Sequence, residues 1–134
     1  MNKIKFLLEK KHTDFNGHVS EAAYLTIAND AIWQVFNSTG LNEIFLAEDI
    51  GPIIFDTHMH FKIEAMEGQK VTVHFKAKLS DDYRKIFRNI DIINENGQIV
   101  VKIESNGAFL DLKKRRIVSA SSKISGKFRE YLSD

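Results

Sequence analysis

The stretch from His12 to Trp33 reads HTDFNGHVSEAAYLTIANDAIW and decides the fold of this 134-residue chain. Residues 14–18 bring together a carboxylate, an amide, a glycine and an imidazole, and an apolar helical pattern follows at once. Unpaired N–H groups and the positive end of the helix dipole at such a helix start favour negative charge. The pattern predicts a reaction centre for a carbonyl substrate, with the rest of the chain wrapped around it.

A long buried helix is predicted over residues 21–38. Ser20 is suited to cap its N-terminus, Ala23 at the third position denies a capping box, and Gly40 is a natural stop. On a helical wheel the apolar side chains cover about half of the circumference, which predicts deep burial. These side chains are Tyr24, Ile27, Ala28, Ala31, Ile32, Val35 and Phe36. Trp33 is the exception, because it falls among the polar residues of the opposite side.

Strands are predicted on both sides of this helix. One strand fits Lys3 to Glu9, and four more follow Gly51-Pro52, over residues 53–64, 71–79, 84–93 and 98–110. Glu67-Gly68-Gln69 is interpreted as a turn between the first two of these four, and Asn96-Gly97 as a two-residue hairpin turn. Short helices are predicted near residues 41–48 and 124–132. A helix that is apolar over half its surface needs a sheet curled around it, so the order predicts an α+β fold with an antiparallel meander.

Composition excludes several classes of protein. A formal net charge of +1 argues against an electrostatic nucleic-acid binder. The absence of cysteine excludes disulfides, thiolate zinc sites and a cysteine nucleophile, and it is compatible with a reducing cytosol. No segment approaches the roughly 20 apolar residues of a membrane span, and residues 1–9 are too short a run for a signal peptide. We therefore expect one cytoplasmic domain over residues 1–134, with neither nucleic acid nor membrane as partner.

The stretch around Asp14 resembles the motif of hotdog-fold acyl-CoA thioesterases, in particular the branch of 4-hydroxybenzoyl-CoA and long-chain acyl-CoA thioesterases. The family pattern runs roughly D-x-x-G-H-V-N-N-x-x-Y-L, followed by an acidic residue and then A-R. The matching positions are Asp14, Gly17, His18, Val19, Tyr24, Leu25 and Ala31. The resemblance extends weakly to about Arg116. It implies a hotdog fold, in which a curved antiparallel sheet of about five strands wraps one long central helix.

The sequence departs from the family pattern at three places. Ser20-Glu21 replaces the usual Asn-Asn, Asn29 stands where many relatives have Glu or Asp, and Ile32 replaces the common Arg. The changes at Asn29 and Ile32 leave substrate preference open, whereas Asp14 is unaffected.

Thioester hydrolysis requires a polarised carbonyl, an attacking water or carboxylate, and a departing thiolate. Asp14 is the candidate for direct attack or for activating water, and the sequence leaves both roles open. The family resemblance places an oxyanion-binding main-chain N–H in the first helical turn, near Glu21. Gly17 lets a substrate approach the backbone closely. Asn16 and His18 are candidates to bind the carbonyl, position water or orient Asp14.

Most of these residues also have a purely structural interpretation. Asp14 can act only as a turn or cap residue, Asn16 belongs to an Asn-Gly turn dipeptide, and His18 can bond to the backbone of its own loop. Tyr24 suits core packing as well as substrate contact. Trp33 can line an acyl pocket or meet a second subunit.

Two basic clusters are candidates for the phosphates of coenzyme A. Arg84 and Lys85 resemble the basic edge of the family that meets the nucleotide, and charge-assisted hydrogen bonds would hold the phosphates there. Residues 113–116, Lys-Lys-Arg-Arg, are interpreted as a solvated surface.

Histidines in the predicted strands offer an alternative, a zinc site. His58 and His60 share one strand face, and His74 on the strand expected next to it can join them. No acid or thiolate accompanies these imidazoles, so we expect no metal. No separate cofactor is expected either, because coenzyme A is part of the substrate.

The resemblance implies hydrolysis of an acyl-CoA or acyl-carrier-protein thioester by a homodimer or homotetramer. A non-catalytic hotdog module for acyl-ligand binding or assembly is one alternative, and Asn29 and Ile32 give it weight. A hotdog hydratase or dehydratase is another. Its D-x-x-N-P-x-H pattern includes a proline and a longer spacing that residues 14–18 lack.

Overall fold

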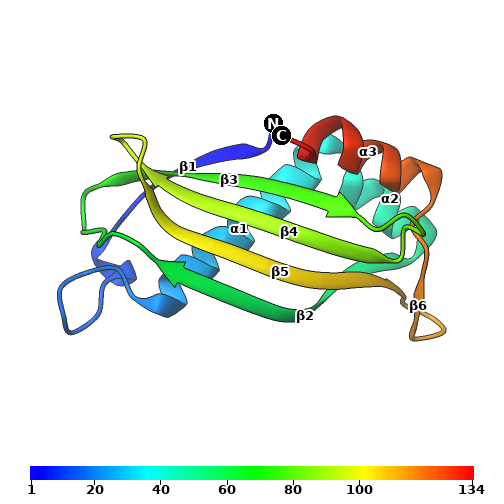
Figure 1. Cartoon of the computed structure of the whole chain (residues 1–134), viewed down its shortest axis with the longest axis horizontal. Coiled ribbons are helices and arrows are strands. Elements are labelled where there is room, and N and C mark those ends of the chain that lie inside the picture. The colour runs from blue at the N-terminus through cyan, green and yellow to red at the C-terminus, as the bar shows by residue number, and fades with distance from the viewer.

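A six-stranded antiparallel sheet curls around one long helix in the computed structural model, which covers residues 1–134 (Figure 1). The strands are β1 (Lys3–Leu7), β2 (Ile50–Phe61), β3 (Lys70–Leu79), β4 (Lys85–Asn94), β5 (Ile99–Asp111) and β6 (Arg116–Val118). The helices are α1 (Glu21–Thr39), α2 (Leu41–Glu48) and α3 (Ser122–Leu132), with a 3-10 turn η1 at Lys10–His12. The predicted α+β hotdog fold is confirmed, with the short β6 added beside β5.

Helix α1 lies along the inner face of the sheet and forms its core (Figure 1). The Ser20 hydroxyl accepts a hydrogen bond from the Ala23 N–H at 3.2 Å, and Gly40 ends the helix with a φ of 84°. Every side chain of the predicted apolar arc is buried, and Thr39 joins them. These residues pack mainly under β1 and β3, so the inner face near β2 is less covered by the helix.

The predicted meander is wrong at its first step. The strand order is β1-β3-β4-β5-β2, so β2 pairs with β5 and is separated from β3 by two strands. The Gly68 turn is not a hairpin, because its main chain bonds to the end of β1. The Gly68 N–H donates to the Leu8 carbonyl at 2.7 Å, and the Leu8 N–H donates to the Gln69 carbonyl at 2.8 Å. Period-two alternation identified the strands but carried no information about their neighbours.

The hairpin between β4 and β5 also differs from the predicted two-residue turn. A type I′ turn needs positive φ at both central residues, whereas only Gly97 has it, at 79°. The loop contains three residues, Glu95 to Gly97, and the Asn94 N–H donates to the Gln98 carbonyl at 2.9 Å. The Asn94 side chain accounts for the longer loop, because its Oδ1 accepts from the Asn96 and Gln98 N–H groups at 3.0 Å each.

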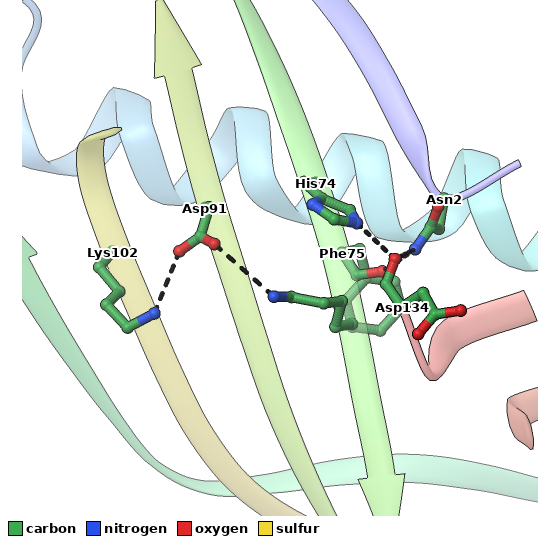
Figure 2. Close-up of polar contacts among 7 residues, drawn as sticks. Asn2, His74, Phe75, Asp91, Lys102 and Asp134 are labelled. Carbon is green, nitrogen blue, oxygen red and sulfur yellow. Dashed lines mark hydrogen bonds and ion pairs between the residues drawn. The ribbon is translucent and has the colours of Figure 1, made fainter. Parts of the chain in front are cut away.

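Polar side chains contact one another on the outer face of the sheet (Figure 2). Buried Asp91 on β4 lies 3.3 Å from the Lys102 ammonium nitrogen and 4.0 Å from that of Lys76. Nearby, the His74 Nε2 lies 2.7 Å from the main-chain oxygen of Asp134, which also accepts from the Asn2 side chain at 3.0 Å. The contacts with Asp134 join the start of β1, strand β3 and the residues after α3. The His74 imidazole therefore has a structural role.

The three histidines considered for zinc are therefore not brought together. His58 and His60 lie on β2, whereas His74 lies on β3 with β4 and β5 between them. At about 4.8 Å per strand, the separation across the sheet is about 14 Å. No group of three or more His, Asp or Glu side chains is placed to hold a metal ion. None of the helices combines the length and the apolar character needed to cross a membrane.

Candidate active site

The loop before α1 is closed by its own main chain. Thr13 and Val19 form an antiparallel bridge, and the Asp14 N–H donates to the His18 carbonyl at 3.0 Å. The Gly17 N–H donates to the Asp14 carbonyl at 3.0 Å. Gly17 has a φ of 80°, in the left-handed region that glycine adopts without a Cβ penalty. Residues 14–18 therefore form one tight turn at the start of the helix.

The Asp14 carboxylate is exposed and is held by one hydrogen bond. Its Oδ1 accepts from the Asn16 N–H at 2.8 Å, which is the geometry of an Asx turn. No other donor and no cation is paired with this carboxylate. Asp14 therefore does have the structural role of a turn residue. That role engages only Oδ1 and leaves Oδ2 without a hydrogen bond, so that Oδ2 is available to a substrate or a water molecule.

The first turn of α1 offers two free main-chain donors. The Ser20 hydroxyl accepts from the Ala23 N–H, and the Ser20 carbonyl accepts from the Tyr24 N–H. The N–H groups of Glu21 and Ala22 find no acceptor in the chain. Such groups at the positive end of a helix can bind an anion or the oxygen of a developing oxyanion.

A surface groove brings Asp14 and the start of α1 together. It is lined by four predicted site residues, Asp14, His18, Glu21 and Tyr24, together with Val19, Phe61, Lys62, Ile63 and Glu64. Burial is the main cause that raises the pKa of Tyr24. The His18 Nδ1 lies 3.2 Å from the Val19 carbonyl oxygen, so this imidazole contacts its own loop. The groove wall from Phe61 to Glu64 was not identified from the sequence as part of the site.

The other predicted site residues lie away from this groove. Asn16 and Gly17 belong to the loop but not to the groove lining. Trp33 is half exposed and twelve residues beyond Glu21, which is about 18 Å along a helix. Arg84 and Lys85 follow the opposite end of β3, about 30 Å away for a ten-residue strand (Figure 1). One chain therefore does not assemble all of the predicted substrate contacts around Asp14.

A second cavity, of about 150 Å³, lies between α1 and the inner face of the sheet. Its lining consists of Asn29, Ile32, Trp33, Phe36, Pro52, Ile54, Phe75, Ile86, Arg88 and Phe128. Arg88 is the single charged residue in this lining, and sequence reasoning missed it. The signal was present, because Arg88 shares the strand alternation of the buried residues Ile86 and Ile90.

The Arg88 guanidinium is only partly satisfied. Its Nη2 donates to the Ser105 hydroxyl at 3.3 Å, whereas its Nε is buried without a hydrogen-bond partner. None of the ion pairs of the molecule involves Arg88. Burial lowers the pKa of Arg88 to about 10, so that the side chain remains positively charged at neutral pH.

The chain belongs to the thioesterase-like superfamily, whose family model matches residues 8–128. A curated relative is the L-carnitine dehydrogenase/betainyl-CoA thioesterase of Agrobacterium fabrum, 29% identical over 106 residues. That match covers 79% of this chain and 22% of the relative, so the chain spans about a fifth of the length of this larger protein.

Solved structures share the fold at low sequence identity. A probable thioesterase from Escherichia coli superposes with a TM-score of 0.88 at 16% identity, covering 99% of this chain and 100% of that one. A Staphylococcus aureus protein solved in complex with CoA superposes with a TM-score of 0.87 at 18% identity, covering 97% of this chain and 82% of that one. A 1,4-dihydroxy-2-naphthoyl-CoA thioesterase from Synechocystis superposes with a TM-score of 0.83 at 14% identity, covering 96% of each chain.

Proposed function

We propose that this protein hydrolyses acyl-CoA thioesters in the groove between the Asp14 loop and the end of β2. The observation that carries the proposal is that one groove is lined both by Asp14, which has a free carboxylate oxygen, and by Glu21, which begins α1 with an unpaired N–H group. A carboxylate and an oxyanion site are the two elements that acyl transfer to water needs. Membership of the thioesterase-like superfamily supports the same reaction.

The reaction follows from these groups. The thioester carbonyl oxygen would lie against the Glu21 and Ala22 N–H groups, which stabilise the negative charge that grows on it during attack. Asp14 takes a proton from the attacking water, or it attacks first and forms a mixed anhydride that water then cleaves. A C–O bond forms, the C–S bond breaks, and the departing thiolate takes up a proton. No cofactor is required beyond the coenzyme A, or the acyl carrier protein, that the substrate itself carries.

The free edge of β2 supports a homodimer, either alone or as half of a tetramer. This twelve-residue strand bonds to β5 on one side and leaves its other side unpaired. Phe55 and Phe61 are 57% and 53% exposed there. A long apolar edge invites pairing with another strand, and two identical edges can pair antiparallel about a two-fold axis.

Such a dimer would complete the site. An axis near the middle of β2 puts the Phe61 end of one strand beside the Ile50 end of the other. Strand pairing places Ile50 and Lys85 at the same end of the sheet. Arg84 and Lys85 of the partner subunit would then lie at the same end of the joined sheet as Asp14, within reach of an extended nucleotide.

Replacing Asp14 by Asn tests the central role of the carboxylate. The Asn oxygen can still accept the Asn16 N–H, so we expect D14N to fold normally. We expect its kcat for acyl-CoA to fall by a factor of about 100 to 10,000, the range for losing an acid–base group. Release of free thiol from acyl-CoA and acyl-carrier-protein substrates measures the rate.

Asp82→Asn is the matched control, because Asp82 forms the same kind of turn. Its Oδ1 accepts from the Arg84 N–H at 3.1 Å, at the end of the sheet away from the groove. D82N should keep the wild-type kcat at saturating substrate, because Asp82 contacts no reacting group and any effect through Arg84 would change KM. Near wild-type turnover in folded D14N would refute the role of Asp14. A wild-type protein that binds acyl-CoA tightly without hydrolysing it would instead favour the binding-module alternative.

A further inference from the structure

Arg88 is the one residue with a buried side-chain nitrogen or oxygen that lacks a hydrogen-bond partner. Burying an unpaired cation is costly, and nearly all buried polar groups in folded proteins are satisfied. The same strand face is otherwise filled by the buried side chains of Ile86, Ile90 and Ile92, so Arg88 is the one charged residue among them. An unpaired cation in a cavity is therefore a candidate for binding a ligand of opposite charge.

The surroundings of Arg88 favour an anion. Asn29 and Trp33 line the same cavity, and neither an Asp nor a Glu does. Ser105 accepts from Arg88 and lies 3.1 Å from the Thr57 hydroxyl, so hydroxyl groups continue from the guanidinium towards the free edge of the sheet. A guanidinium binds a carboxylate through parallel N–H···O bonds, and the free Nε–H is available for one of them.

The size of the cavity limits the ligand. A volume of about 150 Å³ corresponds to about five water-sized groups at ~30 Å³ each. A short chain with a terminal carboxylate fits this space, whereas a nucleotide does not. Among its apolar lining residues, Trp33 and Ile54 are partly exposed, and Ile54 lies near Pro52 on β2, so we infer that the cavity opens near the edge of β2.

We propose that Arg88 and Asn29 bind a carboxylate at the far end of the acyl group, so that the preferred substrates are CoA monothioesters of short dicarboxylic acids. This inference rests on the proposed hydrolysis and on the β2-paired dimer. Within one chain the cavity lies two to three helical turns from Asp14, too far for a short acyl group. In the dimer, the Asp14 groove of one subunit would face the Pro52 and Ile54 mouth of the other.

Paired substrates test the charge preference directly. We expect kcat/KM for glutaryl-CoA to exceed that for its methyl ester at least tenfold, because the ester removes the charge and keeps the chain. A trimethylammonium acyl-CoA such as betainyl-CoA should be the poorest substrate, since Arg88 repels it. Arg88→Met should remove the tenfold preference and keep activity on the methyl ester, and Arg88→Lys should retain part of the preference. Arg129→Met, at an exposed arginine of α3, should change neither rate.

A second measurement does not depend on hydrolysis. Free glutarate should raise the melting temperature of the wild-type protein and of D14N but not that of R88M. Because the guanidinium has no ion-pair partner and its buried Nε makes no hydrogen bond, R88M should be at least as stable as the wild type without ligand. Equal rates for glutaryl-CoA and its ester in an active wild-type enzyme would overturn the inference and leave the proposed hydrolysis standing. A lower melting temperature of R88M with an unchanged preference would also overturn it, since Arg88 would then be structural. If the protein hydrolyses no thioester but binds glutarate through Arg88, the proposed hydrolysis is refuted and the carboxylate site is not.

Discussion

Arg84 donates two hydrogen bonds, one from its main chain and one from its side chain. Its N–H donates to the Asp82 carboxylate at 3.1 Å, and its Nη2 donates to the Ile117 carbonyl on β6 at 3.3 Å. The Ser80 hydroxyl, followed by the Arg84 N–H, lowers the pKa of Asp82, so this turn keeps its carboxylate charged. The guanidinium makes one hydrogen bond, to β6, and remains exposed at the end of the sheet, as a contact for a phosphate requires.

Charge reversal at Arg84 separates nucleotide contact from general surface charge. We expect Arg84→Glu to raise KM for acyl-CoA about tenfold, which corresponds to losing about 1.4 kcal/mol of binding. Its KM for a short thioester without the nucleotide should not change. Lys123→Glu, at an exposed lysine of α3, is the control and should change neither value. Equal effects of R84E on both substrates would count against the contact.

Some candidate site residues could be predicted from the sequence and others could not. Asp14 and the N-terminus of α1 were found because the motif and the helix start coincide along the chain. Arg88 was missed because its isolation is a property of three dimensions, where no carboxylate from any other strand reaches it. Its place in the apolar alternation of β4 was the available signal. The roles of Asp14 and of all the other predicted site residues stay predictions.

At the scale of elements, β2 and β5 meet at a bulge where the main chain of β2 lies close to Gly107. The register of the two strands shifts between Ile54 and Asp56, opposite Gly107. A Cβ at Gly107 would lie 2.1 Å from the Ile53 carbonyl oxygen and 3.1 Å from the Ile54 Cδ1. The bulge bends β2 beside the Arg88 cavity, because Ile54 lines that cavity.

Gly107→Ala should therefore destabilise the protein, because backbone must move to make room. We expect a loss of about 1–3 kcal/mol, the usual cost of overpacking, measured as the free energy of unfolding in urea. Gly126→Ala is the control, and we expect it to raise the free energy of unfolding instead. Nothing lies within 4 Å of a Cβ at Gly126, and alanine in a helix interior is favoured by about 1 kcal/mol. Similar stabilities of G107A and the wild type would show that the β2 bulge relaxes freely.

The elements themselves were largely predictable, whereas their pairing was not. The extent of α1 followed from Ser20, Gly40 and one apolar arc, all of which are local signals. The position of β2 next to β5 depends on the path of residues 62–69, of which the last two, Gly68 and Gln69, bond to the main chain of Leu8. That contact joins segments about sixty residues apart in sequence, so strand alternation had no means to reveal it.

At the scale of the whole molecule, the separation of the candidate site residues within one chain is the argument for the proposed dimer. Asp14 lies at one end of the sheet, and both Arg88 and Arg84 lie towards the other. A two-fold axis on β2 reverses one copy relative to the other and brings unlike ends together. A monomer would then hold the reacting groups without the contacts that position a substrate.

Phe55 tests this arrangement, because it lies near the middle of β2 and would meet its own copy at the axis. We expect Phe55→Glu to convert the dimer to a monomer through repulsion of like charges at the paired edge, measured by light scattering. Its kcat/KM for acyl-CoA should fall although Asp14 is unchanged. Leu7→Glu is the matched control, since Leu7 is 52% exposed on β1, the opposite edge, and should leave the dimer intact.

Phe55→Lys should also be monomeric and weakly active for the same reason. Mixing F55E with F55K places opposite charges across the axis, so the mixture should form a heterodimer. Activity should return with the dimer, because each heterodimer again joins the Asp14 groove of one subunit to the Arg88 cavity of the other. A monomeric F55E with full turnover would show that one chain suffices. A dimer disrupted by L7E instead would place the interface on β1.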